Sequence, residues 1–163
     1  ASIGLGGMYL IVCVKADLVK YISNVRTHVV ATGFGQFLGN KGACLISMDI
    51  GKTSCLFVNC HLPAHQEFSS ERTEALTRIL KTSAGKFSSN PEGPSHTLFD
   101  KVFFFGDLNY RLECKRNVAD SLLTNGLHDQ LLKYDQLLPL LACDENHVGS
   151  EGKLSKNGCC VSS

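Results

Sequence analysis

The stretch GACLISMDIGKTSCLFVNCHL, residues 42–62, contains two apolar segments separated by one Gly-Lys pair. Residues 42–50 and 53–62 both have the length of a strand and are rich in apolar side chains. A two-residue break that contains glycine is typical of a tight antiparallel hairpin. The stretch therefore predicts a hairpin within a sheet, and alternation along its second strand places Asn59 and His61 on one face.

Outside this hairpin, strand-like and helix-like segments alternate along the chain. The first residues are expected to form a loop that enters a strand, and further strands are expected at residues 8–15, 24–34 and 101–106. Helices are expected at residues 16–23, 67–84, 117–127 and 135–143. This alternation indicates an α/β or α+β protein, and the antiparallel hairpin makes the sheet a mixed one.

Composition limits the classes of protein and partner. The 163 residues predict one domain over residues 1–144, followed by a polar tail at 145–163 that is expected to be disordered. A net charge of +1 argues against nucleic acid as a partner. No apolar run approaches the roughly 20 residues that span a bilayer. The eight cysteines form no CxxC pair, so we expect free thiols in a reducing, cytoplasmic compartment.

The stretch VFFFGDLNYRLE, residues 102–113, changes from apolar to polar at Gly106. Ligand sites in α/β proteins tend to lie just beyond the ends of strands. Asp107 and Asn109 could orient one water molecule between a carboxylate and an amide, and Arg111 offers a donor fork that suits phosphate. An Asx turn with a surface arginine explains this stretch equally well when it is considered alone.

Two further stretches carry polar groups next to strands. In GQFLGNKGA, residues 35–43, glycines flank Asn40 and Lys41 and would let an anion approach, although a glycine turn with an exposed lysine is the simpler interpretation. In VNCHLPAH, residues 58–65, His61 ends a strand and Asn59 could hold its imidazole in one tautomer. A histidine at the end of a strand is more often structural than catalytic.

These motifs, taken together and in this order, resemble the inositol polyphosphate 5-phosphatases. The resembling stretches are LGNKGA (38–43), FVNCHLPAH (57–65), ERTEALTRIL (71–80), FFFGDLNYRLE (103–113) and KYDQL (133–137). The resemblance implies the endonuclease/exonuclease/phosphatase fold shared with DNase I-like nucleases. The chain would supply the central part of that catalytic domain, a partial DNase I-like sandwich with one sheet and flanking helices, and an apolar sheet face would stay uncovered.

The resemblance also implies roles for individual residues. Asp107 would be the general base, Asn109 would position the water and the scissile phosphate, and His61 would donate to the phosphoryl oxygens. The implied substrate-binding residues are Asn40, Lys41, Gly42, Asn59, Tyr110, Arg111 and Arg116. The reaction would be a Mg²⁺-assisted hydrolysis of the 5-phosphate of a phosphoinositide or inositol polyphosphate.

The chain also departs from the family pattern. The glutamate that holds Mg²⁺ in the family has no counterpart here, so the metal ligands are unknown, and we expect little hydrolysis by this chain alone. Thr73 and Leu76 stand where many members have Asn and Tyr. The alternatives are a non-catalytic phosphoinositide-binding domain and, ranked lower, a DNase I-like nuclease. Peripheral membrane contact is expected from the substrate class. The CVSS terminus partly fits a prenylation signal at Cys160, but a chance ending is favoured.

Overall fold

The computed structural model describes residues 1–33, 40–87 and 99–141 of the chain. The chain divides into two compact units. The first, called the sheet unit below, comprises Ala1–Pro63 and Glu74–Leu108. The second, called the helical unit, comprises Ala64–Thr73 and Asn109–Ser163. The predicted tail at residues 145–163, with Cys160, lies outside the described residues.

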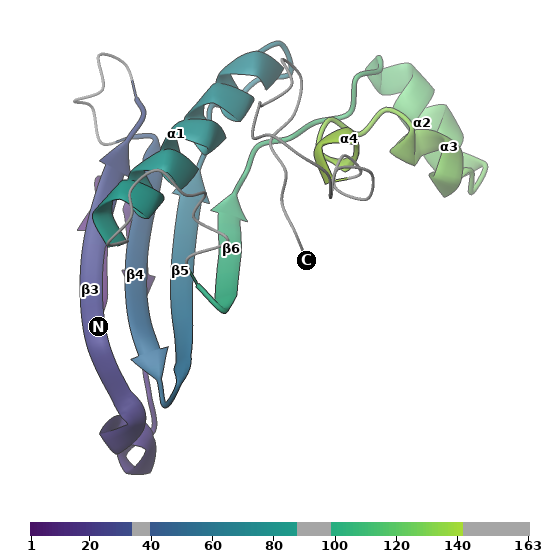
Figure 1. Cartoon of the computed structure of the whole chain (residues 1–163). Coiled ribbons are helices and arrows are strands. Elements are labelled where there is room, and N and C mark those ends of the chain that lie inside the picture. Colours follow the sequence, from purple (N-terminus) through teal and green to yellow (C-terminus); the bar gives the residue numbers. More distant parts are fainter. Residues whose placement is uncertain (34–39, 88–98, 142–163) are drawn as a thin grey trace, which may run out of the picture. The chain divides into compact units, whose positions relative to one another are not determined.

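The sheet unit is built on a four-stranded mixed sheet in the order β3-β4-β5-β6 (Figure 1). The strands are β3 (Ile22–Ala31), β4 (Gly42–Ile50), β5 (Thr53–His61) and β6 (Lys101–Asp107). Neighbours β3, β4 and β5 pair antiparallel, whereas β5 and β6 pair parallel. Both the hairpin and the mixed sheet are therefore confirmed, and Gly51 makes the tight turn with a φ of +63°.

A second hairpin precedes this sheet and was not predicted. Strand β1 (Ser2–Leu5) pairs antiparallel with β2 (Met8–Ile11), where the sequence suggested a loop and one longer strand. The chain reverses at Gly6, which has a φ of +56°. The helix η1 (Ala16–Tyr21) then follows as a single 3₁₀ segment, which confirms the short helix expected at residues 16–23.

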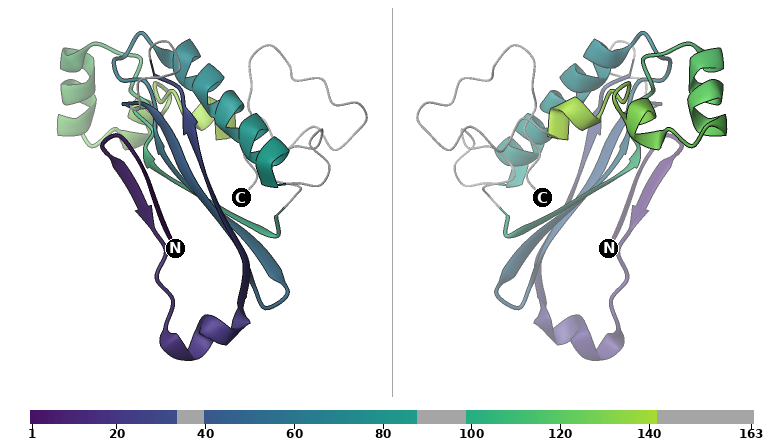
Figure 2. Two further views of the ribbon diagram at one scale, coloured as in Figure 1. Left: turned by 90° about the vertical axis from the view of Figure 1, so that its left-hand side faces the viewer. Right: turned by 90° about the vertical axis from the view of Figure 1, so that its right-hand side faces the viewer.

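The two faces of the sheet are covered by different elements (Figure 2). The β1–β2 hairpin packs Met8 and Leu10 against Cys44 and Ile46, which share one face. Helix α1 (Ser69–Phe87) lies along the opposite face, where its Leu76 and Ile79 are buried. The residues buried on that face of β4 and β5 are Ala43, Leu45, Leu56, Val58 and Cys60. The helix expected at residues 67–84 is thus confirmed within a few residues.

The hairpin face of the sheet carries exposed aromatic side chains on β6. Phe103 is 48% exposed and Phe105 is 41% exposed. Phe57 of β5 stacks on Phe103 with ring centroids 4.9 Å apart. Within the described part of the chain, the expected uncovered apolar face therefore exists, and it lies over β5 and β6.

The helical unit contains α2 (Arg116–Thr124), α3 (His128–Leu132) and α4 (Leu138–Leu141). The first confirms the helix expected at residues 117–127. The helix expected at 135–143 begins later, because the Oδ1 atom of Asp135 accepts hydrogen bonds from the backbone nitrogens of Leu137 (2.6 Å) and Leu138 (2.9 Å) and caps it. Helix α3 was not predicted. None of the helices in the described residues is long and apolar enough to cross a membrane.

Candidate functional site

His61 and Asp107 end two adjacent parallel strands and lie side by side. They are direct partners in the register of β5 and β6. The Nε2 atom of His61 is 3.6 Å from the Oδ2 atom of Asp107. Because partners in parallel strands point to the same face, both side chains lie on the hairpin face of the sheet, where Asp107 is 65% exposed. The structure thus brings together two residues that were singled out separately in the sequence as strand-end groups.

Lys41 completes this cluster from the start of β4. Its Nζ atom lies 2.6 Å from the Nε2 atom of His61. An ammonium group donates and cannot accept, so Nε2 must accept this hydrogen bond and the proton of the neutral ring sits on Nδ1. Lys41 is therefore joined to the cluster and is not an exposed lysine in a glycine turn. Asn40 is exposed in the turn before it, and residues 34–39 of this loop lie outside the described residues.

Two glycines allow the strands that carry this cluster to approach closely. Gly42 has a φ of +144°, and a Cβ atom there would overlap the carbonyl oxygen of Val30. Gly106 has a φ of +122°, and a Cβ atom there would overlap the carbonyl oxygen of Cys60 and lie 2.6 Å from the Oδ1 atom of Asn59. Both positions therefore require glycine. The backbone of β6 can approach β5 next to Asp107 only because Gly106 has no side chain.

Asn59 connects the β1–β2 hairpin to the sheet. Its Nδ2 atom donates a hydrogen bond to the carbonyl oxygen of Tyr9 in β2, at 3.1 Å. The sequence suggested that this amide would hold the imidazole of His61, but its nitrogen is directed to the hairpin backbone. The structure thus gives Asn59 a role in attaching β2, and its predicted contact with substrate stays a prediction.

Asn109 and Arg111 lie in the helical unit, and only Leu108 separates Asn109 from Asp107 in the chain. Asn109 has a φ of +57°, a conformation that asparagine tolerates better than most residues. The guanidinium of Arg111 donates to the Oδ1 atom of Asn109 at 2.7 Å and to its carbonyl oxygen at 3.1 Å. Arg111 therefore folds back onto Asn109.

The other two predicted residues of this segment have partners within the helical unit. Arg116 forms an ion pair with Asp120 one turn further along α2, with Nε 2.8 Å from Oδ1. The hydrogen bond to Asp120 raises the pKa of Arg116 above its usual value. The ring of Tyr110 lies beneath the guanidinium of Arg72, 5.5 Å from ring centroid to Cζ.

Arg72 and Gln136 were not singled out from the sequence, yet both are buried polar residues in the described part of the helical unit. Arg72 is 0% exposed and Gln136 is 7% exposed. Burial lowers the pKa of Arg72 from its ordinary value. Arg72 belongs to the stretch ERTEALTRIL, and Gln136 belongs to KYDQL. Both stretches already resembled the family, and this resemblance was the sequence feature that could have drawn attention to the two residues.

The described residues do not form a metal site by themselves. They contain no group of three or more His, Cys, Asp and Glu side chains that could hold a metal ion. His61 and Asp107 supply two such groups, but the Nε2 atom of His61 is occupied by the cationic Lys41. This donor set does not fit a divalent cation, and the expected Mg²⁺ stays a prediction.

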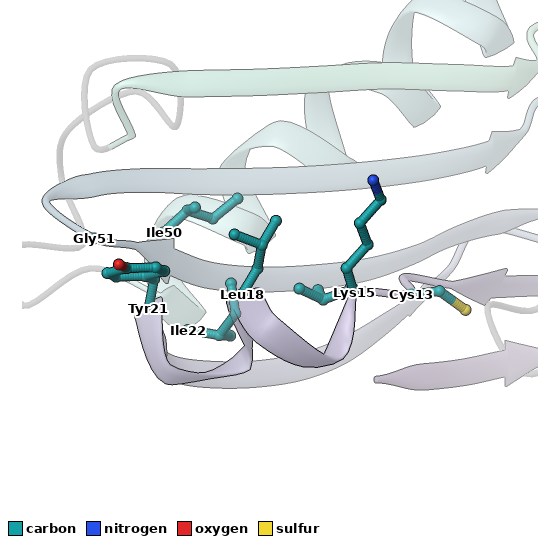
Figure 3. A pocket seen from close by; sticks show the side chains of 8 residues that line it. Cys13, Lys15, Leu18, Tyr21, Ile22, Ile50 and Gly51 are labelled. Carbon is teal, nitrogen blue, oxygen red and sulfur yellow. The ribbon is translucent and has the colours of Figure 1, made fainter.

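The sheet unit also contains a groove (Figure 3). Its volume is about 460 Å³, and it is lined by Cys13, Val14, Lys15, Leu18, Tyr21, Ile22, Ile50 and Gly51. Gly51 makes the turn between β4 and β5, whereas His61 is at the far end of β5. The groove therefore contains none of the predicted site residues.

Comparison with known proteins identifies the family. Residues 1–148 match the model of Endonuclease/Exonuclease/phosphatase family 2. Type I inositol polyphosphate 5-phosphatase 8 of Arabidopsis thaliana is 37% identical over 84% of this chain and 29% of that protein. Phosphatidylinositol 3,4,5-trisphosphate 5-phosphatase 2A of Danio rerio is 38% identical over 82% of this chain and 10% of that protein.

Solved structures show the same relationship. The inositol polyphosphate 5-phosphatase domain of SPsynaptojanin, in complex with inositol (1,4)-bisphosphate and calcium ion, has a TM-score of 0.71 and 32% identity over 85% of this chain. The Cimex nitrophorin ferrous NO complex has a TM-score of 0.52 at 22% identity, which shows a common fold alone.

This chain spans 39% of the synaptojanin domain chain and less than a third of the two curated relatives named above. The family match nevertheless runs from the first β-hairpin through the Lys41, His61 and Asp107 cluster to the helical unit. The chain belongs to the endonuclease/exonuclease/phosphatase family, and the relatives that it matches over most of its length are inositol polyphosphate 5-phosphatases.

Proposed function

We propose that this chain contributes to a site that hydrolyses the 5-phosphate of inositol polyphosphates or phosphoinositides. The observation that carries the proposal is the cluster of Lys41, His61 and Asp107, in which a lysine, a histidine and a carboxylate converge at the ends of strands. The names of the relatives support the reaction and the substrate class. Since the chain spans only part of each relative, the activity of the whole protein belongs to the proposal.

Each member of the cluster can take a defined part in such a reaction. The exposed carboxylate of Asp107 can accept a proton from an attacking water. The ammonium of Lys41 is the cationic donor that suits the charge on phosphoryl oxygens. The neutral ring of His61 accepts from Lys41 at Nε2 and would hold that ammonium in place. In this arrangement Lys41, and not His61 as expected, would donate a hydrogen bond to the phosphoryl oxygens.

The proposal also includes a divalent cation, a cytoplasmic location and peripheral contact with a membrane. A calcium ion accompanies the inositol bisphosphate in the synaptojanin complex, and this supports a divalent cation. The described residues do not hold such a cation by themselves. Free thiols at Cys13, Cys44, Cys55 and Cys60 support a reducing, cytoplasmic location. Peripheral membrane contact would follow if the substrate is a lipid.

The second candidate function is binding of a phosphoinositide headgroup without hydrolysis. The described residues contain no metal-holding group, and this specific observation favours it. A nuclease is disfavoured by the net charge of +1, because nucleic-acid binding usually depends on a strongly basic surface.

The test is phosphate release from inositol 1,4,5-trisphosphate, with inositol 1,4-bisphosphate as the substrate that lacks the 5-phosphate. We expect slow turnover by the chain alone and a further loss of about 100-fold or more in Asp107→Asn, because a general base contributes at least that much. Asp129→Asn, on the exposed surface of α3, is the matched control and should change nothing. Turnover that survives in Asp107→Asn would refute the proposed hydrolysis. Specific binding without turnover would favour the second candidate.

A further inference from the structure

The side-chain amide of Gln136 uses its full hydrogen-bonding capacity inside the helical unit. Its Oε1 atom accepts from the Nη2 atom of Arg72 at 2.5 Å and from the backbone nitrogen of Arg111 at 3.0 Å. Its Nε2 atom donates to the carbonyl oxygen of Gln66 at 2.9 Å and to the carboxylate of Glu113 at 3.2 Å. Because guanidinium and backbone N–H groups only donate, the amide can sit in one orientation alone.

Arg72 fixes the other side of this group. Its side chain is fully buried, and its Nη1 atom donates to the carbonyl oxygen of His65 at 2.6 Å. A buried guanidinium stays charged and is tolerated only when it is well paired. Neither Arg72 nor Gln136 can therefore turn away without leaving buried polar groups unsatisfied, so the pair forms a rigid base.

Arg111 connects the buried pair of Arg72 and Gln136 to Asn109. The Arg111 backbone is anchored by Gln136, and its side chain holds Asn109 at two points, the Oδ1 atom and the carbonyl oxygen. Since a guanidinium cannot accept, the amide oxygen of Asn109 must face Arg111, and the amide nitrogen lies on the other side of the same planar group. The contacts thus run without a gap from a buried arginine to Asn109.

We propose that Arg72 and Gln136 are positioning residues that set the orientation of the Asn109 amide through Arg111. The inference rests on the proposed function, because that function gives Asn109 a part in placing the phosphate and the water. Neither Arg72 nor Gln136 is expected to touch substrate. Arg111 acts here as the clamp on Asn109, in place of the direct phosphate contact that the sequence suggested.

The experiment follows two NMR signals of the full chain, the side-chain NH₂ resonances of Asn109 and the hydrogen exchange of the residue 111 amide. Arg111→Met should move the Asn109 resonances and leave the exchange unchanged, because the Gln136 bond to the backbone remains. Gln136→Met should move the same resonances and also raise the exchange rate about fivefold, the effect of losing one ordinary hydrogen bond. Asn125→Ala removes a comparable side-chain bond, from Nδ2 to the Ser121 carbonyl at 2.8 Å, and should change neither signal.

A purely structural role for the pair predicts a different result, namely lower stability with unmoved Asn109 resonances in the folded chain. That result in Gln136→Met would overturn the proposal. If this variant does not fold, Gln136→Asn replaces it, since an amide one methylene shorter cannot reach Arg111 and should give the same two signals.

A titration with inositol 1,4,5-trisphosphate separates this inference from the proposed function. Weaker binding by Gln136→Met together with moved Asn109 resonances supports both. If the resonances move but the unmodified chain does not bind the probe, the positioning stands and the proposed function fails. If the unmodified chain binds the probe and the resonances do not move in either variant, the positioning is wrong and the proposed function is unaffected.

Discussion

Replacing Gly106 with alanine tests whether the close approach of β6 to β5 beside Asp107 depends on a missing side chain. The backbone at Gly106 has a φ of +122°, and the new Cβ atom would overlap the carbonyl oxygen of Cys60 and lie 2.8 Å from its backbone nitrogen. Both obstacles are backbone atoms of the neighbouring strand, so no rotation of a side chain can relieve the overlap. The strands must separate at the point where His61 faces Asp107.

The magnitude follows from two separate effects. An unfavourable φ costs about 1–3 kcal/mol, and forcing an extra carbon into a packed site costs about 1–3 kcal/mol. The sum is about 4 kcal/mol at the middle of these ranges, against a total stability of about 5–15 kcal/mol. For a chain of 163 residues, each kcal/mol lowers the melting temperature by about 2–4 °C, so we expect a loss of about 12 °C.

Two further alanine variants separate these effects in a thermal melt followed by far-ultraviolet circular dichroism. Gly51 also has a positive φ, +63°, but nothing lies within 4 Å of its added Cβ atom. Gly51→Ala should therefore lose only the conformational part, about 1–2 kcal/mol. Nothing lies within 4 Å at Gly7 either, and its φ lies outside the positive range, so Gly7→Ala should melt like the unmodified chain.

The reasoning is refuted if Gly106→Ala loses no more stability than Gly51→Ala. In that case the neighbouring strand yields without cost, and the spacing of His61 and Asp107 would not be set by the backbone. A loss in Gly7→Ala as large as that in Gly51→Ala would show instead that alanine is poorly tolerated at any turn of this chain.

Three other changes have expected outcomes. Burial, together with the nearby charge of Lys86, lowers the pKa of His28 below its ordinary value of 6.5. The unfolded chain therefore binds a proton at His28 more readily than the folded chain does, and the stability of the fold decreases as the pH falls below 6.5. His28→Gln should flatten this part of the pH dependence in urea unfolding. Ser47 is 1% exposed and its hydroxyl has no hydrogen-bond partner in the described residues, so Ser47→Ala should raise stability by up to about 1 kcal/mol in the same assay. We expect the uncovered apolar face to make the chain self-associate, and Phe103→Ser should reduce this association in sedimentation, because Phe103 is 48% exposed there. Association that is unchanged in the variant would mean that another surface is responsible.

Local patterns predicted most of the sheet unit. The Gly51 turn and the apolar runs defined β4 and β5, since hairpin geometry depends on a few neighbouring residues. The β1–β2 hairpin was missed because its strands have four residues each, too few for periodicity to separate a strand from a loop. The end of α1 and the start of α4 differed from expectation by the few residues that capping decides.

The sequence predicted which residues belong to the site, but it did not predict the hydrogen bonds among them. Strand ends placed His61 near Asp107, because parallel neighbours bring their carboxyl ends together. Lys41 lies beside His61 because β4 pairs with β5: Gly42 is the register partner of His61, and Lys41 directly precedes Gly42. The role of Gln136 could not be predicted, because its side chain bonds to Arg72 and to Gln66, which are 64 and 70 residues away in the chain, and no local pattern records such distances.

The parallel pairing of β5 and β6 also has a kinetic consequence. The hydrogen bond from the Ser54 backbone nitrogen to the Asp100 carboxylate, next to the paired strands, joins residues 46 apart in the chain, and the register partners His61 and Asp107 share that separation. The entropy of closing so long a loop must be overcome before the pair gains any contact energy, so this edge should form late during folding. Local opening of β6 would remove Asp107 from His61 in one step. The cluster should therefore assemble and disassemble as a unit, and it should be absent from early folding intermediates in which β3, β4 and β5 are already paired.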